Sequence, residues 1–247
     1  DVPVLLNRRA DRKFTGCGTL RAPVAPGIAS APGQSIRNER QSLAGAARTR
    51  GSKRRQRRAL TIDAGGLVAS AVQVRSPNCD ARPPGTDLSL IVVHGISLPP
   101  GRFGGDAIRR LFTNRLNPAS HPYFASIAGL RVSAHFLIRR AGVLLQFVPC
   151  TARAWHAGES TWRGRSACND FSIGIELEGA DDRPYTGAQY RTLADLVRAL
   201  AERYGIRDVA GHSDIARGRK TDPGPHFDWR RVPPPARAPA PRFGRRS

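Results

Sequence analysis

Methionine is absent from the 247-residue sequence, and cysteine is scarce and never paired as CxxC. The four cysteines, Cys17, Cys79, Cys150 and Cys168, are widely spaced. This spacing excludes a zinc ribbon and a dense disulfide framework. Free thiols in a reducing compartment account for them most simply, which favours a cytoplasmic protein.

Long apolar runs are also missing, and no stretch approaches the ~20 residues of a membrane-spanning helix. The opening VPVLL is too short for the apolar core of a signal peptide. A second candidate follows KRRQRR, but Asp63 and the Gly65–Gly66 pair interrupt its apolar part. We therefore expect no membrane span and no signal peptide. The absence of methionine, with Asp at position 1, leaves room for a start inside a longer reading frame or for an unexpressed first segment.

Acidic residues are scarce at both ends of the chain. Residues 1–60 carry 14 Lys and Arg against 3 Asp and Glu, and residues 230–247 carry 6 against none. The intervening residues are close to balance, so the net charge of +21 describes the ends. We expect a disordered basic extension at 1–62 and a basic, proline-rich tail at 231–247, around a domain at 63–230. Such tails predict weak, salt-dependent contact with polyanions, and no nucleic-acid-binding motif accompanies them.

The middle of the chain alternates between strand and helix patterns. The apolar, β-branched run at 88–96 predicts a strand buried on both faces, and 172–179 alternates as a second strand. Residues 131–139 and 143–149 predict a hairpin. Residues 187–204 predict a helix, with a capping box before it and a glycine after it. Strands and helices mixed in this way predict one α/β domain.

The segment GHSDIARGRKTDPGP, residues 211–225, gathers ionisable groups in a short stretch. It contains His212, Asp214, Lys220 and Asp222. Its glycine and proline content predicts an irregular loop rather than a regular helix, and the proline after Asp222 favours an extended backbone there. Ionisable groups concentrated on an ordered loop indicate binding or catalysis. We interpret this loop as one half of a zinc site.

A catalytic zinc site needs three ligands from His, Asp, Glu or Cys and one open position for water. His94, His212 and Asp222 could supply the ligands from strand ends and a loop. Water in the open position would have a pKa near ~7 and could act as a nucleophile. Glu176, on the non-aliphatic face of its strand, could act as general base, and Lys220 could face the developing oxyanion.

The residues alone leave alternatives open. His135 in the expected hairpin and His156 in a tryptophan-containing loop compete as ligands. Asp214 offers a second carboxylate from the same loop as the first, and Glu178 lies on the same strand face as the candidate base. Spacing does not decide between these residues.

A family resemblance covers nearly all of residues 67–229. It is carried by SPNCDARP, IVVHGISLPPGRFGG, HPYFASIAGLRVSAHFLIRR, RAWHAG, CNDFSIGIELEG, YTGAQY and GHSDIARGRKTDPGPHFDW. Together these stretches resemble the zinc-dependent N-acetylmuramoyl-L-alanine amidases related to peptidoglycan-recognition proteins. Within that group they resemble the AmpD-type 1,6-anhydro-N-acetylmuramoyl-L-alanine amidases of cell-wall recycling. The resemblance implies a single α/β domain with a central mixed β-sheet flanked by helices.

The resemblance also assigns roles residue by residue. It implies that His94, His212 and Asp222 bind Zn²⁺, that Glu176 is the catalytic carboxylate and that Lys220 stabilises the transition state. The two rival histidines then become structural or supporting residues, and the rival aspartate orders its loop.

Substrate contacts follow less directly from the resemblance. Arg131 and Trp155 fall in stretches where the family lines its substrate cleft. Two positions depart from the family pattern: Gly95 stands where the family carries Asn, and Ala167 stands where it carries a basic residue. Both departures bear on sugar and peptide contacts rather than on hydrolysis itself.

The resemblance implies a monomeric zinc amidase that cleaves the bond between (1,6-anhydro)-N-acetylmuramic acid and the L-alanine of a stem peptide. The expected substrate is an anhydromuropeptide recycled in the cytoplasm. One alternative is a secreted or periplasmic amidase that acts on intact peptidoglycan. The other is a non-catalytic peptidoglycan-recognition module, which the complete zinc-and-base set disfavours.

Overall fold

Two parallel strands in which every residue is buried form the centre of the sheet. They are β3 (Leu90–Ile96) and β9 (Ser172–Glu178), and they pair in register along their whole length. The structure, a computed structural model, describes residues 59–235. Strands buried on both faces read as continuous apolar runs because helices or loops cover each side. This explains the run of aliphatic residues in β3.

Four further strands complete a six-stranded mixed sheet in the order β1-β5-β4-β9-β3-β10. Their bounds are β1 Val72–Gln73, β4 Phe136–Ile138, β5 Leu144–Gln146 and β10 Asp208–Gly211. β4, β9, β3 and β10 run parallel, whereas β5 is antiparallel to β4 in the expected hairpin. The central mixed sheet of the predicted α/β fold is therefore present.

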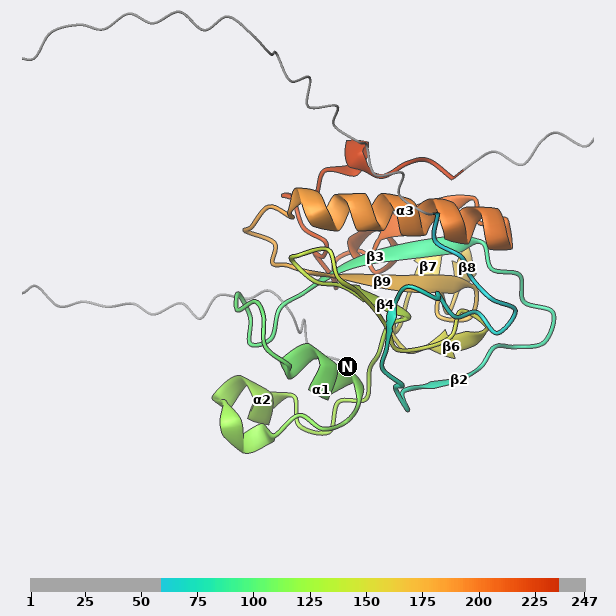
Figure 1. Ribbon diagram of the computed structural model, residues 1–247. Helices are drawn as coiled ribbons and strands as arrows, with labels where there is room; N and C mark the ends of the chain where they lie inside the picture. The colour runs from blue at the N-terminus through green and yellow to red at the C-terminus, as the bar shows by residue number, and fades with distance from the viewer. Residues whose placement is uncertain (1–58, 236–247) are drawn as a thin grey trace, which may run out of the picture. The chain divides into compact units, whose positions relative to one another are not determined.

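The long helix α3 (Gly187–Tyr204) covers one face of the sheet (Figure 1). Thr186 and Gln189 form the predicted capping box, and Gly205 ends the helix in the left-handed conformation at φ 66°. The buried stripe of the helix packs against the aliphatic face of β9; the cluster includes Leu193, Leu196, Val197, Leu200, Ile173, Ile175 and Leu177. Each such side chain contributes about 1.5–3 kcal/mol when fully buried.

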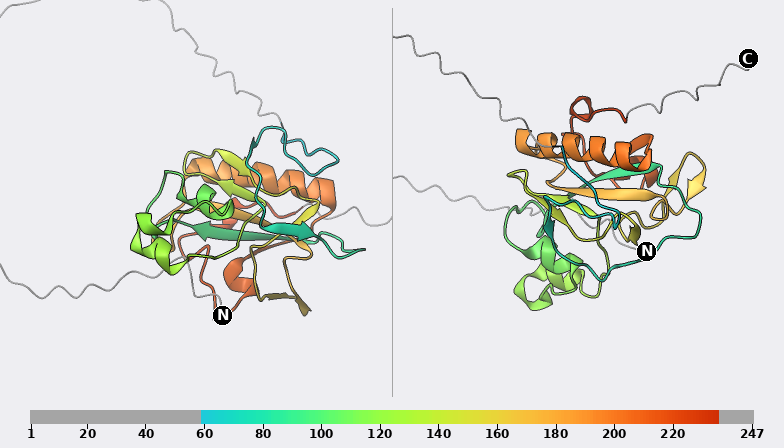
Figure 2. Two further views of the ribbon diagram at one scale, coloured as in Figure 1. Left: turned by 90° about the horizontal axis from the view of Figure 1, so that it is seen from below. Right: turned by 45° about the vertical axis from the view of Figure 1, so that its right-hand side comes forward.

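Shorter elements lie on the opposite face, as Figures 1 and 2 show for α1 (Ala107–Phe112) and α2 (Pro122–Ser126). Their apolar side chains form a second cluster with the sheet, which includes Ile108, Phe112, Phe124, Ile127, Leu137 and Phe147. A one-turn helix, α4, spans His212–Ile215 directly after β10. The remaining elements are β2 Cys79–Ala81 with β6 Ala152–Ala154, β7 Thr161–Trp162 with β8 Arg165–Ser166, and 3₁₀ turns at Pro118–Ser120 and Trp229–Arg231. The site described below lies on this face.

Three local expectations were wrong in extent. The segment 131–139 pairs as a strand only at Phe136–Ile138, because the N–H of Ser133 donates to the Trp155 carbonyl in a loop instead of to a sheet neighbour. The segment 211–225 is not irregular throughout, since it begins with α4. Asp214 stabilises that turn by accepting from the Gly211 N–H at 2.8 Å. The tryptophan-containing segment around His156, which we expect to be a loop, contains the β7–β8 hairpin.

The expected terminal segments fall mainly outside the described residues. Two residues of the expected N-terminal extension are exceptions. Leu60 and Ile62 pack against the first core cluster, and Ile62 forms an isolated bridge with Val68. The packed domain therefore includes residues before position 63. Across residues 59–235, no helix is long and apolar enough to cross a membrane. Cys79, Cys150 and Cys168 are free thiols, and Cys17 lies outside the described residues.

Candidate metal and catalytic centre

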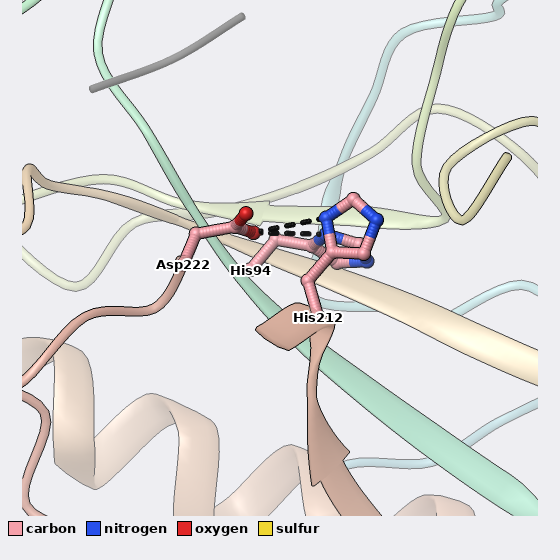
Figure 3. Close-up of side chains that lie close together, drawn as sticks. All are labelled: His94, His212 and Asp222. Carbon is pink, nitrogen blue, oxygen red and sulfur yellow. Dashed lines mark hydrogen bonds and ion pairs between the residues drawn. The ribbon is translucent and has the colours of Figure 1, made fainter. Parts of the chain in front are cut away.

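His94, His212 and Asp222 converge at the C-terminal ends of two neighbouring parallel strands (Figure 3). β3 carries His94, and β10 pairs with β3 up to Gly211 opposite Val93, so the two histidines leave the sheet side by side. The loop after α4 returns Asp222 to them. The Nδ1 atoms of the histidines lie 3.0 Å apart, and Asp222 Oδ2 lies 3.3 Å from His94 Nδ1 and 3.2 Å from His212 Nδ1.

Hydrogen-bond chemistry indicates what this cluster can hold. His212 Nε2 lies 3.2 Å from the Ala157 carbonyl oxygen, which has no proton to give, so this nitrogen carries the hydrogen. In the neutral ring, Nδ1 of His212 then presents a lone pair to His94 and Asp222. Donor atoms bound tetrahedrally to zinc at 2.0–2.1 Å lie roughly 3.3 Å apart. The three observed separations match that spacing, so the donor set fits a zinc ion.

The electrostatics of the cluster favour the metal-binding form of His94. Burial, followed by the charge of His212, lowers the pKa of His94 to about 4. The imidazole is therefore neutral at pH 7, which is the protonation state that a metal requires. Two hydrogen bonds fix the backbone at Asp222. The Asp222 carbonyl accepts from the Ser213 N–H at 2.9 Å, and the Pro223 carbonyl accepts from the Tyr185 hydroxyl at 2.9 Å.

Glu176 lies beside the cluster on β9, directly opposite His94 in the β3–β9 ladder. Its side chain is buried, and Oε2 has no hydrogen-bond partner among residues 59–235. Burial, and then the negative charge of Asp222, raises the pKa of Glu176 well above its usual range. A carboxyl group with a raised pKa and a free oxygen is suited to exchanging a proton with a reacting group at neutral pH.

Lys220 completes the charged part of the site from the loop between α4 and Asp222. Its backbone N–H donates to the Ala216 carbonyl at 3.0 Å, which fixes the turn before Asp222. Burial lowers the pKa of the Lys220 ammonium, and the charge of Asp222 acts in the opposite direction. The side chain lines the same pocket as Glu176.

The cavity volume of this pocket is about 60 Å³, and most of its remaining lining is apolar. The apolar wall comes mainly from α1 and from the segment that follows α2: Leu111, Phe112, Ile127, Leu130 and Val132. Charged groups interact more strongly beside an apolar wall than in water, because the local dielectric constant is lower. The pocket thus joins a candidate metal site, a carboxylate and an ammonium in one cavity.

Comparison with known proteins identifies the family. The sequence pattern of the N-acetylmuramoyl-L-alanine amidase family matches residues 84–225. The chain belongs to this family. It is 58% identical over 168 residues to the 1,6-anhydro-N-acetylmuramyl-L-alanine amidase AmpD of Citrobacter freundii, which covers 67% of this chain and 90% of that protein. It is 56% identical over 168 residues to AmpD of Escherichia coli K12, covering 67% and 92%.

Solved structures agree with the family. The crystal structure of a selenomethionine derivative of AmpD matches this amidase with a TM-score of 0.68 and 57% identity, covering 70% of this chain and 97% of that one. The solution structure of Citrobacter freundii AmpD matches with a TM-score of 0.52 and 57% identity, covering 70% and 92%. The predicted family, the mixed α/β fold and the amidase class are confirmed.

The two predicted substrate residues stand at the edge of the amidase site. Arg131 is exposed, and the residues on either side of it line the pocket although Arg131 itself does not. Trp155 is half-buried and does not belong to the pocket lining. Their roles in substrate binding stay predictions.

The rival residues occupy other positions. His135 directly precedes β4, and its Nδ1 accepts from the N–H of Gly174 in β9 at 3.0 Å. Glu178 accepts from the Gly104 N–H at 2.6 Å and the Arg140 N–H at 3.2 Å, so it ties two loops to β9. Asp214 only orders α4. His156, in contrast, contacts His94, a relationship that no spacing in the sequence indicated because the two residues are 62 positions apart.

The pocket wall was also missed. Leu111 and Phe112 follow Ile108 at helical spacing, which predicts a helix face buried in a core, and all three side chains are buried. Sequence periodicity cannot separate an apolar side chain that fills a core from one that also borders a cavity.

Proposed function

We propose that this amidase hydrolyses the amide bond between (1,6-anhydro)-N-acetylmuramic acid and the L-alanine of a stem peptide, with zinc as its cofactor. The observation that carries the proposal is the convergence of His94, His212 and Asp222 within 3.0–3.3 Å, beside Glu176 and Lys220 in one pocket. The relatives that are 56–58% identical carry the 1,6-anhydro activity in their names, which supports the anhydro sugar as substrate.

The residues divide the chemistry between them. When bound to His94, His212 and Asp222, zinc supplies Lewis acidity that polarises a carbonyl and acidifies a water molecule. Glu176 accepts the proton of the attacking water through its free Oε2 and delivers it to the leaving nitrogen. Lys220 places its positive charge where the amide oxygen becomes negative.

The surroundings of this centre suit a muropeptide. The apolar wall of Leu111, Phe112 and Ile127 excludes water from the reacting amide and strengthens the electrostatic interactions there. Arg131, which is exposed beside the pocket, would meet a carboxylate of the lactyl or peptide region. We assign the enzyme to cytoplasmic peptidoglycan recycling and to a monomeric state; its free thiols at Cys79, Cys150 and Cys168 are consistent with a reducing compartment.

The experiment that tests this function compares two substrates. Purified protein is incubated with anhydromuropeptide and, separately, with intact sacculi, and free stem peptide is detected by mass spectrometry. We expect release from the anhydromuropeptide and little from sacculi. Release from sacculi alone would assign the enzyme to intact peptidoglycan, and release from neither would leave a recognition module.

The basic ends of the chain support a separate, weaker proposal. Their excess of arginine and lysine would bind polyanions through charge alone, with affinity that falls steeply as salt increases. Deleting residues 1–58, which keeps the core residues Leu60 and Ile62, should abolish retention on heparin and leave amidase activity intact. Unchanged retention would contradict a role for the extension.

A further inference from the structure

A chain of three hydrogen-bonding side chains leads away from His94 on the side opposite the metal cluster. His94 Nε2 lies 3.0 Å from His156 Nδ1, and His156 Nε2 lies 3.3 Å from the hydroxyl oxygen of Ser172. That hydroxyl donates to the Cys168 carbonyl at 2.5 Å. Each of the three side chains is at least nine-tenths buried. Water is therefore not needed to complete the chain.

The direction of every hydrogen bond in the chain follows from the acceptor at its end, the Cys168 carbonyl. The Cys168 carbonyl can only accept, so it takes the single hydroxyl hydrogen of Ser172. The Ser172 oxygen must then accept from His156 Nε2, which places the hydrogen of that imidazole on Nε2. Nδ1 of His156 is left as an acceptor.

The same reasoning continues one step further to His94. Because His156 Nδ1 accepts, His94 Nε2 donates, and the lone pair of neutral His94 lies on Nδ1. This is the atom that faces His212 and Asp222. The opposite polarity would put a hydrogen on His94 Nδ1 and would need a second hydroxyl hydrogen on Ser172, which does not exist.

Both candidate histidine ligands are thus oriented by backbone carbonyls. Ala157 acts on His212 directly at 3.2 Å, whereas Cys168 acts on His94 through Ser172 and His156. The sheet makes room for the intermediate ring at Gly174, because a Cβ at this position would overlap the imidazole of His156. A glycine in the middle of a buried strand is unfavourable for the strand itself, and the approaching ring explains it here.

We propose that His156 and Ser172 are positioning residues that hold His94 in the tautomer whose Nδ1 lone pair binds the metal. This inference rests on the proposed function, in which His94 is a zinc ligand. Removing the hydrogen-bond partner of a metal-binding histidine typically weakens metal affinity about 10- to 100-fold. We expect a loss of that size when the chain is broken at Ser172.

The affinity test uses Ser172→Ala, which removes the hydroxyl with little change in volume. The matched control is Ser76→Ala, because Ser76 is also buried and also donates to a backbone carbonyl at 2.5 Å, that of Phe112. Zinc affinity is measured for the full-length protein by competition with a chromogenic chelator. Ser172→Ala should bind zinc about 10- to 100-fold more weakly than wild type, whereas Ser76→Ala should bind it unchanged.

The first part of a spectroscopic test uses the wild-type protein alone, so it does not depend on whether a variant folds. The ¹⁵N chemical shifts of the imidazoles in the metal-free wild-type protein distinguish a protonated Nε2 from a protonated Nδ1. His94 and His156 should both be protonated at Nε2, and Ser172→Ala should yield a tautomer mixture at His156.

The possible results distinguish a failure of the proposed function from a failure of this inference alone. A wild-type protein that binds no zinc overturns the proposed function and this inference with it. Normal zinc binding with His94 protonated at Nδ1, or equal affinities for Ser172→Ala and Ser76→Ala, overturns the inference alone.

Discussion

Glu176 and His94 are direct partners in the ladder between the two central strands. Paired residues of neighbouring parallel strands project to the same face of the sheet, so the candidate base and a candidate zinc ligand are fixed relative to each other by backbone hydrogen bonds. Both strands are buried throughout. A site mounted on rigid strands holds its geometry more accurately than one mounted on loops. Of the remaining site residues, His212 comes from the start of α4, and only Lys220 and Asp222 come from a loop.

Replacing Glu176 should separate proton transfer from metal binding. Glu176→Gln keeps the shape of the side chain and removes its ability to take a proton, so turnover should fall by about 10²- to 10⁴-fold. Zinc stoichiometry should stay at the wild-type value. Hydrolysis is followed by release of stem peptide, and zinc by atomic absorption.

Glu178→Gln is the control on the same strand face. Glu178 accepts from the N–H groups of Gly104 and Arg140 and therefore ties loops rather than reacting groups. We expect lower stability with turnover close to wild type. Full activity of Glu176→Gln, or equal losses in both variants, would contradict the assigned base.

Lys220 should contribute to the transition state rather than to substrate binding. Lys220→Met removes the positive charge from the pocket and should lower kcat by about 10²- to 10³-fold with a smaller change in KM. The exposed Arg217 on the same loop offers a charge-matched control, and Arg217→Met should leave both constants near wild type. A change confined to KM would assign Lys220 to ground-state binding instead.

Removing the metal should weaken the fold as well as abolish activity. Three electron-rich atoms, on His94, His212 and Asp222, lie within 3.0–3.3 Å of one another and repel when no cation is between them. A ligand present at 1,000 times its Kd stabilises the native state by about 4 kcal/mol, so dialysis against a chelator should lower Tm by several degrees. One equivalent of zinc should restore Tm and activity together. An unchanged Tm in the metal-free protein would show that the cluster is not coupled to folding.

Local sequence signals predict helices and strands, whereas features that depend on contacts between distant residues cannot be predicted from the sequence alone. Thr186, Gln189 and Gly205 define the ends of α3 through interactions within a few residues, so sequence alone placed that helix correctly. The candidate ligands His94 and His212 are 118 positions apart, and only the resemblance singled them out from the other histidines. The sequence does not predict the contact of His156 with His94, because this contact depends on how the segment after β6 folds back over β9.

Acid should destabilise the protein through His135. Burial, and then the positive charge of Arg82 at 3.0 Å, lowers the pKa of His135 to about 3, whereas the unfolded chain has a value of about 6.5. The unfolded state therefore binds more protons between pH 3 and pH 6.5, and stability is complete above this window and falls as pH decreases through it. From pH 7.5 to pH 5 the loss from this residue is about 2 kcal/mol. Urea unfolding of wild type and His135→Asn at both pH values measures the difference, and an equal pH dependence in the two proteins would contradict it.

Gly95 and Tyr185 should behave as a coupled pair. A Cβ at position 95 would overlap the hydroxyl of Tyr185, which donates to the Pro223 carbonyl beside Asp222. Gly95 does not have a positive φ, so this overlap is the obstacle to a side chain there.

Gly95→Ala should cost about 1–3 kcal/mol of unfolding free energy, and Tyr185→Phe about 1 kcal/mol through the lost hydrogen bond. Because Tyr185→Phe also removes the overlapping oxygen, the double variant should be more stable than the sum of the two losses predicts, by roughly 0.5 kcal/mol or more. Additive losses in a urea-unfolding double-mutant cycle would contradict the coupling.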